Sequence, residues 1–213
     1  MTAMHASVPA ARTSPESAPA ATGASFADPG PLGLAAFALT TFILSFANAD
    51  IIKAEPVVFG VALFYGGIVQ ILAGMWEFVK GNTFGATAFA SYGGFWLAFW
   101  YLATRTDLSS FAPAEAQHGV GLFLLGWTIF TAYMWISSFR TNTALVVVFT
   151  LLTITFAFLT LGDLTTTPNL TKIGGFVGIA TAVVAWYTSF AGVANSTFGR
   201  TVLPTGAPVV RTH

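Results

Sequence analysis

The chain has 213 residues, of which 55% are hydrophobic and only 8% are charged, and its formal net charge at neutral pH is zero. A soluble domain typically carries about 25% charged residues, so this chain has too few charges to cover a water-exposed surface. The neutral balance offers no basic patch for a nucleic acid, and the absence of cysteine excludes disulfides, thiolate chemistry and cysteine metal sites.

Residues 1–27 come first and are rich in Ala, Ser, Thr and Pro without apolar periodicity, which is typical of a disordered tail and not of a signal peptide. Six apolar blocks follow, each long enough for an α-helix that rises about 1.5 Å per residue to cross a hydrocarbon core about 30 Å thick. The blocks are Leu32–Ala49, Val57–Val79, Phe84–Ala103, His118–Phe139, Thr143–Leu161 and Ile173–Ala194. We therefore predict an all-α integral membrane protein, with a six-helix transmembrane domain at 28–204 and a C-terminal tail at 205–213.

The charged residues between the blocks predict the orientation in the membrane. With the N-terminus inside, the inner segments contain five Lys or Arg residues and the outer segments contain three. The inner ones are Arg12, Lys80, Arg140, Arg200 and Arg211, and the outer ones are Lys53, Arg105 and Lys172. Because cytoplasmic segments carry the excess of Lys and Arg, we expect a multi-pass protein of the plasma membrane with both termini in the cytoplasm.

The first motif, Asp28-Pro29-Gly30-Pro31-Leu32-Gly33-Leu34, precedes the first apolar block. Pro29 and Pro31 suit a first helical turn, where a missing N–H costs nothing, and Asp28 can cap the helix. Gly33 adds a residue without a side chain one turn further on. The motif is explained as an ordinary helix start, or as a helix N-terminus whose free N–H groups help to attract an anion. The Asp28 carboxylate argues against direct anion binding, because it would compete for those donors.

A second motif, Glu77 to Gly85, joins the second and third blocks. Glu77 and Lys80 are three residues apart at a helix end and can form an ion pair. Asn82 or Thr83 can cap the next helix. This pattern favours a helix–turn–helix corner at the membrane interface, while the depth of Glu77 leaves open a role in proton coupling.

Most polar residues inside the blocks are uncharged. Phe37, Thr41, Leu44 and Asn48 share one helical face, which suits either a narrow, partly wet path or an interhelical hydrogen-bond seam. Thr40 and Gln70 are further candidates for lining such a path. No His or carboxylate cluster has the spacing of metal ligands, and no catalytic set lies at membrane depth, so we expect no enzyme activity, metal or cofactor.

Taken in order, these motifs resemble the acetate uptake transporter family, which comprises the succinate–acetate permeases and their fungal relatives. The segment 28–34 resembles the family signature Asn-Pro-Ala-Pro-Leu-Gly-Leu. The resemblance continues through the segments at 64–67, 70–74, 81–85, 91–93 and 198–204. In this chain, Asp28 replaces the signature Asn and Gly30 replaces the Ala, so a neutral amide has become a carboxylate.

The resemblance implies a homo-hexamer in which each subunit has its own path for acetate, and in some members for succinate. Its members have been described both as proton-coupled carriers and as channel-like. Carried over by motif position, the narrowest point is formed by Phe37, Tyr92 and Leu152, with Leu151 as a rival for the third position. Ala185, midway along the sixth block, is a further candidate for lining the path.

Three other functions compete with carboxylate transport. The chain is also compatible with a channel for a small neutral solute such as urea or ammonia, and with a membrane sensor that binds acetate without moving it. An intramembrane enzyme is the weakest hypothesis, because the sequence lacks a catalytic set.

Overall fold

The computed structural model describes residues 26–210, in which every regular element is a helix. The predicted tail at 1–27 falls outside this range except for its last two residues. The elements are α1 (Gly30–Asn48), α2 (Val57–Leu63), the π-helix η1 (Phe64–Val69), α3 (Gln70–Lys80), α4 (Thr83–Arg105), α5 (Pro113–Ser138), α6 (Thr143–Leu164) and α7 (Pro168–Phe198). Because α2, η1 and α3 follow one another without a break, they form one span, and the structure contains the six spans that the sequence predicts.

Five of these spans are long and apolar enough to cross a membrane by length and hydropathy alone. The sixth, α4, has 23 residues, but it contains three Gly and two Tyr along with Thr, Ser and Trp, which lower its hydropathy. It packs against α3 on one side and touches α5 on the other. The prediction of an all-α, multi-pass membrane protein is therefore confirmed.

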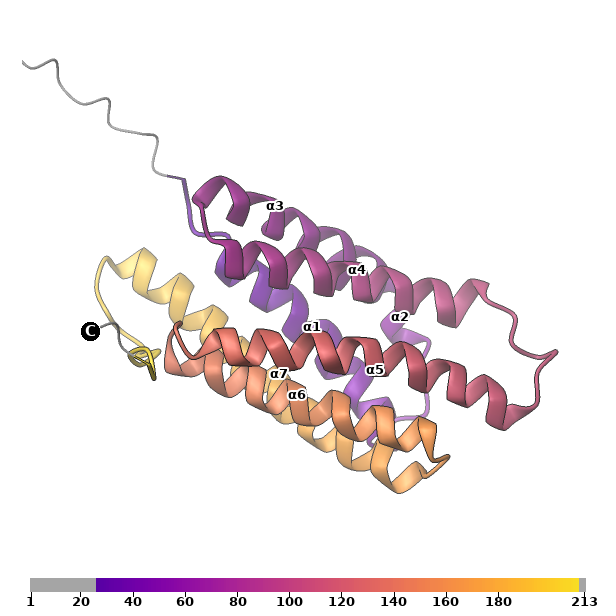
Figure 1. The fold of residues 1–213 in the computed structure, drawn as a ribbon. Coiled ribbons are helices and arrows are strands. Elements are labelled where there is room, and N and C mark those ends of the chain that lie inside the picture. Colours follow the sequence, from indigo (N-terminus) through magenta and orange to yellow (C-terminus); the bar gives the residue numbers. More distant parts are fainter. Residues whose placement is uncertain (1–25, 211–213) are drawn as a thin grey trace, which may run out of the picture.

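The bundle is built around α1, which packs against α7, α3, η1, α2 and α4. Figure 1 shows α3 and α4 along one side of α1 and α5, α6 and α7 along the other. The crossing of α1 and α7 is close, because a Cβ atom at Gly175 would collide with the backbone of Ala49. Small residues at such crossings let two membrane helices approach to backbone contact.

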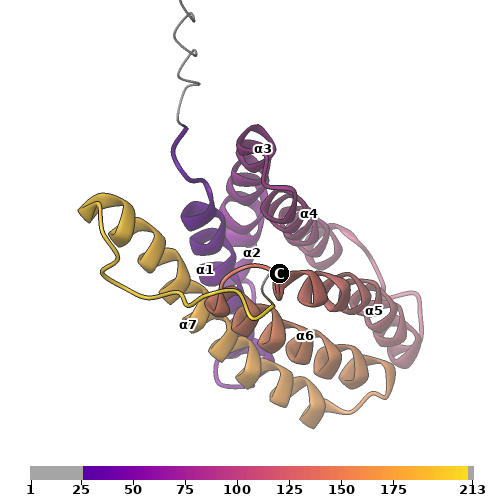
Figure 2. The same ribbon diagram turned by 60° about the vertical axis from the view of Figure 1, so that its left-hand side comes forward.

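The start of α1 and the end of α7 lie at the same end of the bundle (Figure 1). From the end of α7 the chain runs back toward the turn between α5 and α6 (Figure 2). There the Ala144 N–H donates to the Thr205 carbonyl at 2.9 Å, and the Val210 N–H donates to the Phe139 carbonyl at 3.1 Å. The predicted C-terminal tail is thus packed on the bundle as far as residue 210.

The π-helix η1 occupies the middle of the second span. Its Gly66 lies against α1, where an added Cβ would stand 2.6 Å from the Thr40 hydroxyl oxygen. A π-helical turn is an α-helix with an extra residue, and such turns are often found at functional sites. The turn ends at Gln70, the first residue of α3.

Candidate functional site

A cavity of about 400 Å³ opens at the end of the bundle where α1 begins, and we call it the terminus-side cavity. Its walls come from α1, α3, α4, α6 and α7. The lining residues include Asp28, Pro31, Phe37, Gln70, Glu77, Lys80, Asn82, Phe84, Phe89, Tyr92, Thr141, Asn142, Phe149, Leu152, Thr188, Asn195 and Thr205. By the same measure a single water needs roughly 10–15 Å³, so a small hydrated solute fits.

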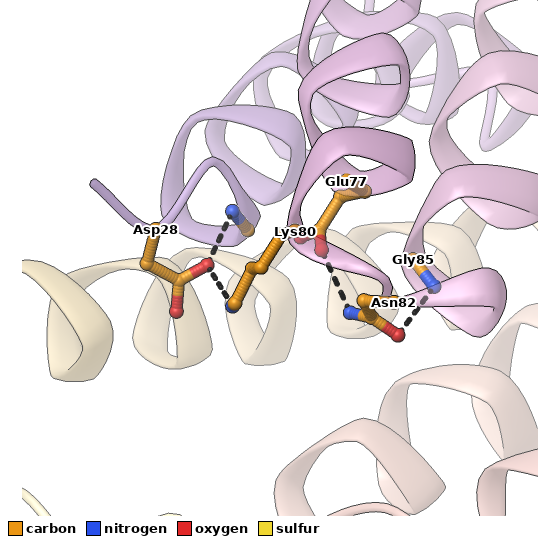
Figure 3. Close-up of polar contacts among 6 residues, drawn as sticks. Asp28, Glu77, Lys80, Asn82 and Gly85 are labelled. Carbon is orange, nitrogen blue, oxygen red and sulfur yellow. Dashed lines mark hydrogen bonds and ion pairs between the residues drawn. The ribbon is translucent and has the colours of Figure 1, made fainter. Parts of the chain in front are cut away.

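Polar contacts connect the helix ends at the mouth of this cavity (Figure 3). The Lys80 ammonium at the end of α3 lies 2.8 Å from Asp28 Oδ1, which also accepts the Gly30 N–H at 2.9 Å. The predicted ion pair between Glu77 and Lys80 is therefore wrong, because Lys80 reaches the start of α1 instead. Asp28 binds the first residue of α1 from one position before the N-cap, which is Pro29.

Glu77 lies one helical turn before Lys80 on α3 and is only 1% exposed. Its Oε2 accepts the Asn82 side-chain amide at 2.8 Å, and Asn82 Oδ1 accepts the Gly85 N–H at 3.1 Å (Figure 3). Asn82 is thus the N-cap of α4, while Thr83 is the first residue of that helix. One amide satisfies both a buried carboxylate and a free helix N-terminus.

Phe37, Tyr92 and Leu152 lie together in the wall of the terminus-side cavity. Each is buried, and each lies seven to nine residues from the start of its helix, or about 10–14 Å along the axis. The Phe37 and Tyr92 rings are 5.8 Å apart between centroids, and the Tyr92 hydroxyl is 3.0 Å from the Thr131 hydroxyl. Leu152 lines the cavity, whereas Leu151 is absent from its lining.

Gln70 is fully buried, and neither atom of its side-chain amide has a hydrogen-bond partner in the described structure. It lines the terminus-side cavity directly after the π-helix. Leaving a buried polar group unpaired costs roughly 1–3 kcal/mol, so this amide is available for a ligand or water in the cavity. The amide has both a donor and an acceptor to offer.

Other predicted path residues lie elsewhere. The Thr40 hydroxyl donates to the Ala36 carbonyl at 2.9 Å and packs on Gly66, outside the lining of the cavity. Ala185 is fully buried in the hydrophobic core. Thr188, which the sequence did not predict as a path residue, lines the cavity one helical turn after Ala185.

A second cavity of about 460 Å³ lies at the other end of α1, and we call it the opposite cavity. Asn48 and Asp50 line it together with Lys172 from the start of α7. Asp50 has a positive φ of 62° and forms ion pairs with Lys53 and, at 2.8 Å, with Lys172. Hydrogen bonds from Lys172 and then Lys53 lower the pKa of Asp50 to about 2.

Buried hydroxyl groups lie between the two cavities. Thr41 on α1 is buried with an unpaired hydroxyl, and the Thr155 and Thr181 hydroxyls of α6 and α7 are 3.3 Å apart. The α1 face predicted from Phe37, Thr41, Leu44 and Asn48 therefore begins in the terminus-side cavity, passes Thr41 and ends in the opposite cavity. Its two ends belong to different cavities, which periodicity alone does not reveal.

Part of the cavity rim was unforeseen from the sequence. Asn195 accepts the N–H groups of Val202 and Leu203 and donates to the Leu203 carbonyl, which folds the chain back after α7. This fold brings Thr205 to the cavity lining. Within residues 26–210, no group of three His, Cys, Asp or Glu side chains is arranged to hold a metal ion.

Comparison with known proteins gives close relatives. The chain is 43% identical over 195 residues to acetate permease A of Emericella nidulans, covering 84% of this chain and 65% of the relative. It is 42% identical over 176 residues to ammonia transport outward protein 2 of Saccharomyces cerevisiae, covering 80% of this chain and 62% of the relative. The chain thus spans less than two thirds of the length of these fungal relatives.

A bacterial relative matches over nearly its whole length. The chain is 38% identical over 180 residues to the succinate-acetate/proton symporter SatP of Escherichia coli, covering 84% of this chain and 95% of the relative. A solved structure of the bacterial acetate channel SatP matches with a TM-score of 0.79 and 37% identity, covering 85% of this chain and 100% of that one. The model of the GPR1/FUN34/yaaH family matches residues 10–207. This chain therefore belongs to the GPR1/FUN34/yaaH family.

Proposed function

We propose that this protein moves acetate, and succinate as a second substrate, across the plasma membrane along a path within each subunit. The path joins the terminus-side cavity to the opposite cavity. The observation that carries the proposal is the cavity wall at Phe37, Tyr92 and Leu152, beside the buried and unpaired amide of Gln70. The choice of substrate is supported by the relatives, which are named as an acetate permease, a succinate-acetate/proton symporter and an acetate channel.

The residues of this wall fit a short carboxylate. Phe37 and Leu152 present apolar surface of a size suited to a methyl group, while the Gln70 amide can donate to a carboxylate oxygen. None of these side chains carries a fixed charge, so an anion can be desolvated partly without being trapped. At neutral pH a carboxylic acid with a pKa of roughly 4 is almost wholly ionised, so the carboxylate is the form offered to the path.

Liposome flux tests the proposal. Purified protein is reconstituted, and uptake of labelled acetate is compared between the wild type and Phe37→Asp, with Phe198→Asp on the exposed end of α7 as the matched control. We expect flux in the wild type and the control and almost none in Phe37→Asp, because a fixed charge in the apolar wall repels acetate and obstructs its path. Equal flux in Phe37→Asp and wild type would contradict the assigned path.

Current across a planar bilayer tests the mode of transport. Conduction of the acetate anion produces an acetate-dependent current, whereas symport of acetate with one proton is electroneutral. Because Phe37, Tyr92, Leu152 and Gln70 carry no fixed charge, and the buried polar groups described between the two cavities are hydroxyls, we favour anion conduction through the path. Acetate flux without current would instead favour proton symport, with Glu77 as the first residue to test.

Orientation and assembly are part of the same proposal. The excess of Lys and Arg supports an orientation with both termini, and with them the terminus-side cavity, in the cytoplasm. We expect a homo-hexamer within the lipid bilayer. The exposed apolar face of α5, which includes Leu122, Ile129 and Ile136, is available for contact with lipid or another subunit.

Ammonia is the second candidate cargo, because one relative is named as an ammonia transport outward protein. Ammonia would need no cation at the mouth and would pass the same apolar wall. Ammonia-driven pH change in liposomes without any acetate uptake would favour this function. Binding of acetate without flux would favour a sensor.

A further inference from the structure

The mouth of the terminus-side cavity contains a cation that is already paired with a carboxylate. Lys80 is the only cationic side chain among the lining residues of this cavity in the described part of the chain. Its ammonium lies 2.8 Å from Asp28 Oδ1, while the Lys80 side chain is 38% exposed and the Asp28 side chain is 52% exposed. Both groups thus remain accessible to a solute that arrives at the mouth.

The position of Asp28 is fixed independently of Lys80. The same Oδ1 accepts the Gly30 N–H at 2.9 Å, and the neighbouring Pro29 restricts the backbone. In the described structure Lys80 forms its ion pair with Asp28 and not with Glu77, whose Oε2 accepts the Asn82 amide. The Asp28 carboxylate is therefore tethered at the mouth and stays near Lys80 when the ion pair between them opens.

Asp28 and a short carboxylate substrate carry the same functional group. We propose, on the basis of the proposed function, that Asp28 is a tethered competitor of the substrate. An arriving carboxylate must displace Asp28 from Lys80. Asp28 thereby lowers the affinity of the mouth for anions. Half-exposed ion pairs are weak, so the exchange is easily reversed and the expected effect on affinity is about two- to five-fold.

The exchange has a consequence for turnover. A lysine without a counter-charge at the mouth would hold an anion longer and attract it over a greater distance. Attraction between exposed charges is screened by salt, with a Debye length of about 10 Å at 0.1 M. Removing the Asp28 charge should therefore increase both the affinity for acetate and the salt dependence of that affinity.

A double-mutant cycle in proteoliposomes tests the proposal through the KM for acetate uptake. Asp28→Asn keeps an oxygen that can accept the Gly30 N–H but removes the charge. We expect Asp28→Asn to lower KM about two- to five-fold and to steepen its rise with ionic strength. Lys80→Gln should raise KM, and Asp28→Asn should have no further effect on KM in the Lys80→Gln background.

The cycle separates competition from a merely structural role. If Asp28 only stabilises the start of α1, Asp28→Asn changes KM equally with and without Lys80. That result would overturn the proposal. So would an unchanged KM in the single variant. Asp28→Glu, which restores the charge, should return KM toward the wild-type value.

Two controls make the readout specific. Asp107→Asn removes an exposed aspartate from the loop between α4 and α5, outside both cavities, and should leave KM unchanged. Size-exclusion chromatography in detergent shows that each variant is folded and assembled like the wild type. Absence of acetate flux in the wild type would overturn the proposed function and this inference together, whereas wild-type flux with additive effects of Asp28 and Lys80 would overturn this inference alone.

Discussion

Leu152 is the aliphatic member of the apolar cavity wall, where it is 3% exposed next to the Phe37 and Tyr92 rings. Leu152→Ala removes three carbon atoms from the wall. We expect it to admit bulkier acids, so that the uptake of lactate rises relative to acetate in competition assays. Such a truncation also costs roughly 2–5 kcal/mol of folding free energy, so uptake must be normalised to assembled protein.

Leu151 provides the matched control for Leu152. It has the same side chain and lies one residue earlier on α6, but it does not line the terminus-side cavity. Leu151→Ala should leave the ratio of lactate to acetate uptake unchanged. If Leu151→Ala changed this ratio more than Leu152→Ala, then Leu151, and not Leu152, would belong to the wall.

Asp50 offers a prediction for the opposite cavity. Its pKa of about 2 lies below the usual value of 3.8, chiefly because Lys172 donates to it. The ionised form is thus favoured by folding, and this contribution is complete above pH 3.8 and is lost as the pH falls through about 2. We expect Lys172→Gln to raise the Asp50 pKa toward 3.8, as followed by the carboxyl carbon shift in NMR. Lys53→Gln should raise it less, and the reverse order would contradict the assignment.

Residue types in the motifs predicted several individual positions but not their partners. Asn82 caps α4, because helix caps depend on local sequence, and Phe37 lines the terminus-side cavity. The contact of Lys80 with Asp28 spans 52 positions, and three-residue spacing had favoured Glu77 instead. Spacing along one helix cannot show that the start of α1 packs beside the end of α3.

At the level of elements, Asn82 joins α3 to α4. Asn82→Ala removes the cap of α4, which costs about 0.5–2 kcal/mol, and leaves the buried Glu77 carboxylate without its amide donor. Asn142 caps α6 through the Leu145 N–H in the same way, with no carboxylate attached, so Asn142→Ala is the matched control. Unfolding in mixed detergent micelles should show a larger loss of stability for Asn82→Ala. Equal losses would mean that the bond to Glu77 contributes nothing.

Element boundaries followed from the sequence less well than the elements themselves. α5 begins at Pro113, before its predicted block. α7 runs from Pro168 to Phe198 and extends beyond its predicted block at both ends. Hydropathy marks the length of a helix inside the hydrocarbon core, whereas helices continue into the aqueous layers until Pro, Gly or a cap ends them. The π-helix carries no hydropathy signal at all.

For the whole molecule, the proposed separate path in each subunit predicts that the subunits act independently. Wild-type and Phe37→Asp chains are co-expressed with different tags, and mixed assemblies of known composition are reconstituted. We expect the acetate flux to fall in proportion to the fraction of Phe37→Asp chains, because each wild-type chain retains a complete path. A much steeper fall, in which one altered chain inactivates its assembly, would indicate a shared path.

The architecture of the whole chain was predictable because lipid imposes a simple rule: every spanning segment must satisfy its own backbone hydrogen bonds and be apolar for about 20 residues. The cavities were not predictable, since they depend on how far the helices are spaced. Gly66 against Thr40 and Gly175 against Ala49 set that spacing, and either glycine read alone is only a small residue in a helix.

The π-helix at Phe64–Val69 also determines where this chain tolerates a change of length. A deletion inside an α-helical span rotates one part of the helix by about 100° relative to the other and turns its inward face to lipid. A π-helical turn already stores an extra residue, so losing one there restores an α-helix without rotating either flank. A one-residue deletion within 64–69 should therefore keep Gln70 directed at the terminus-side cavity, whereas a deletion within 71–76 should separate the orientation of Gln70 from that of Glu77.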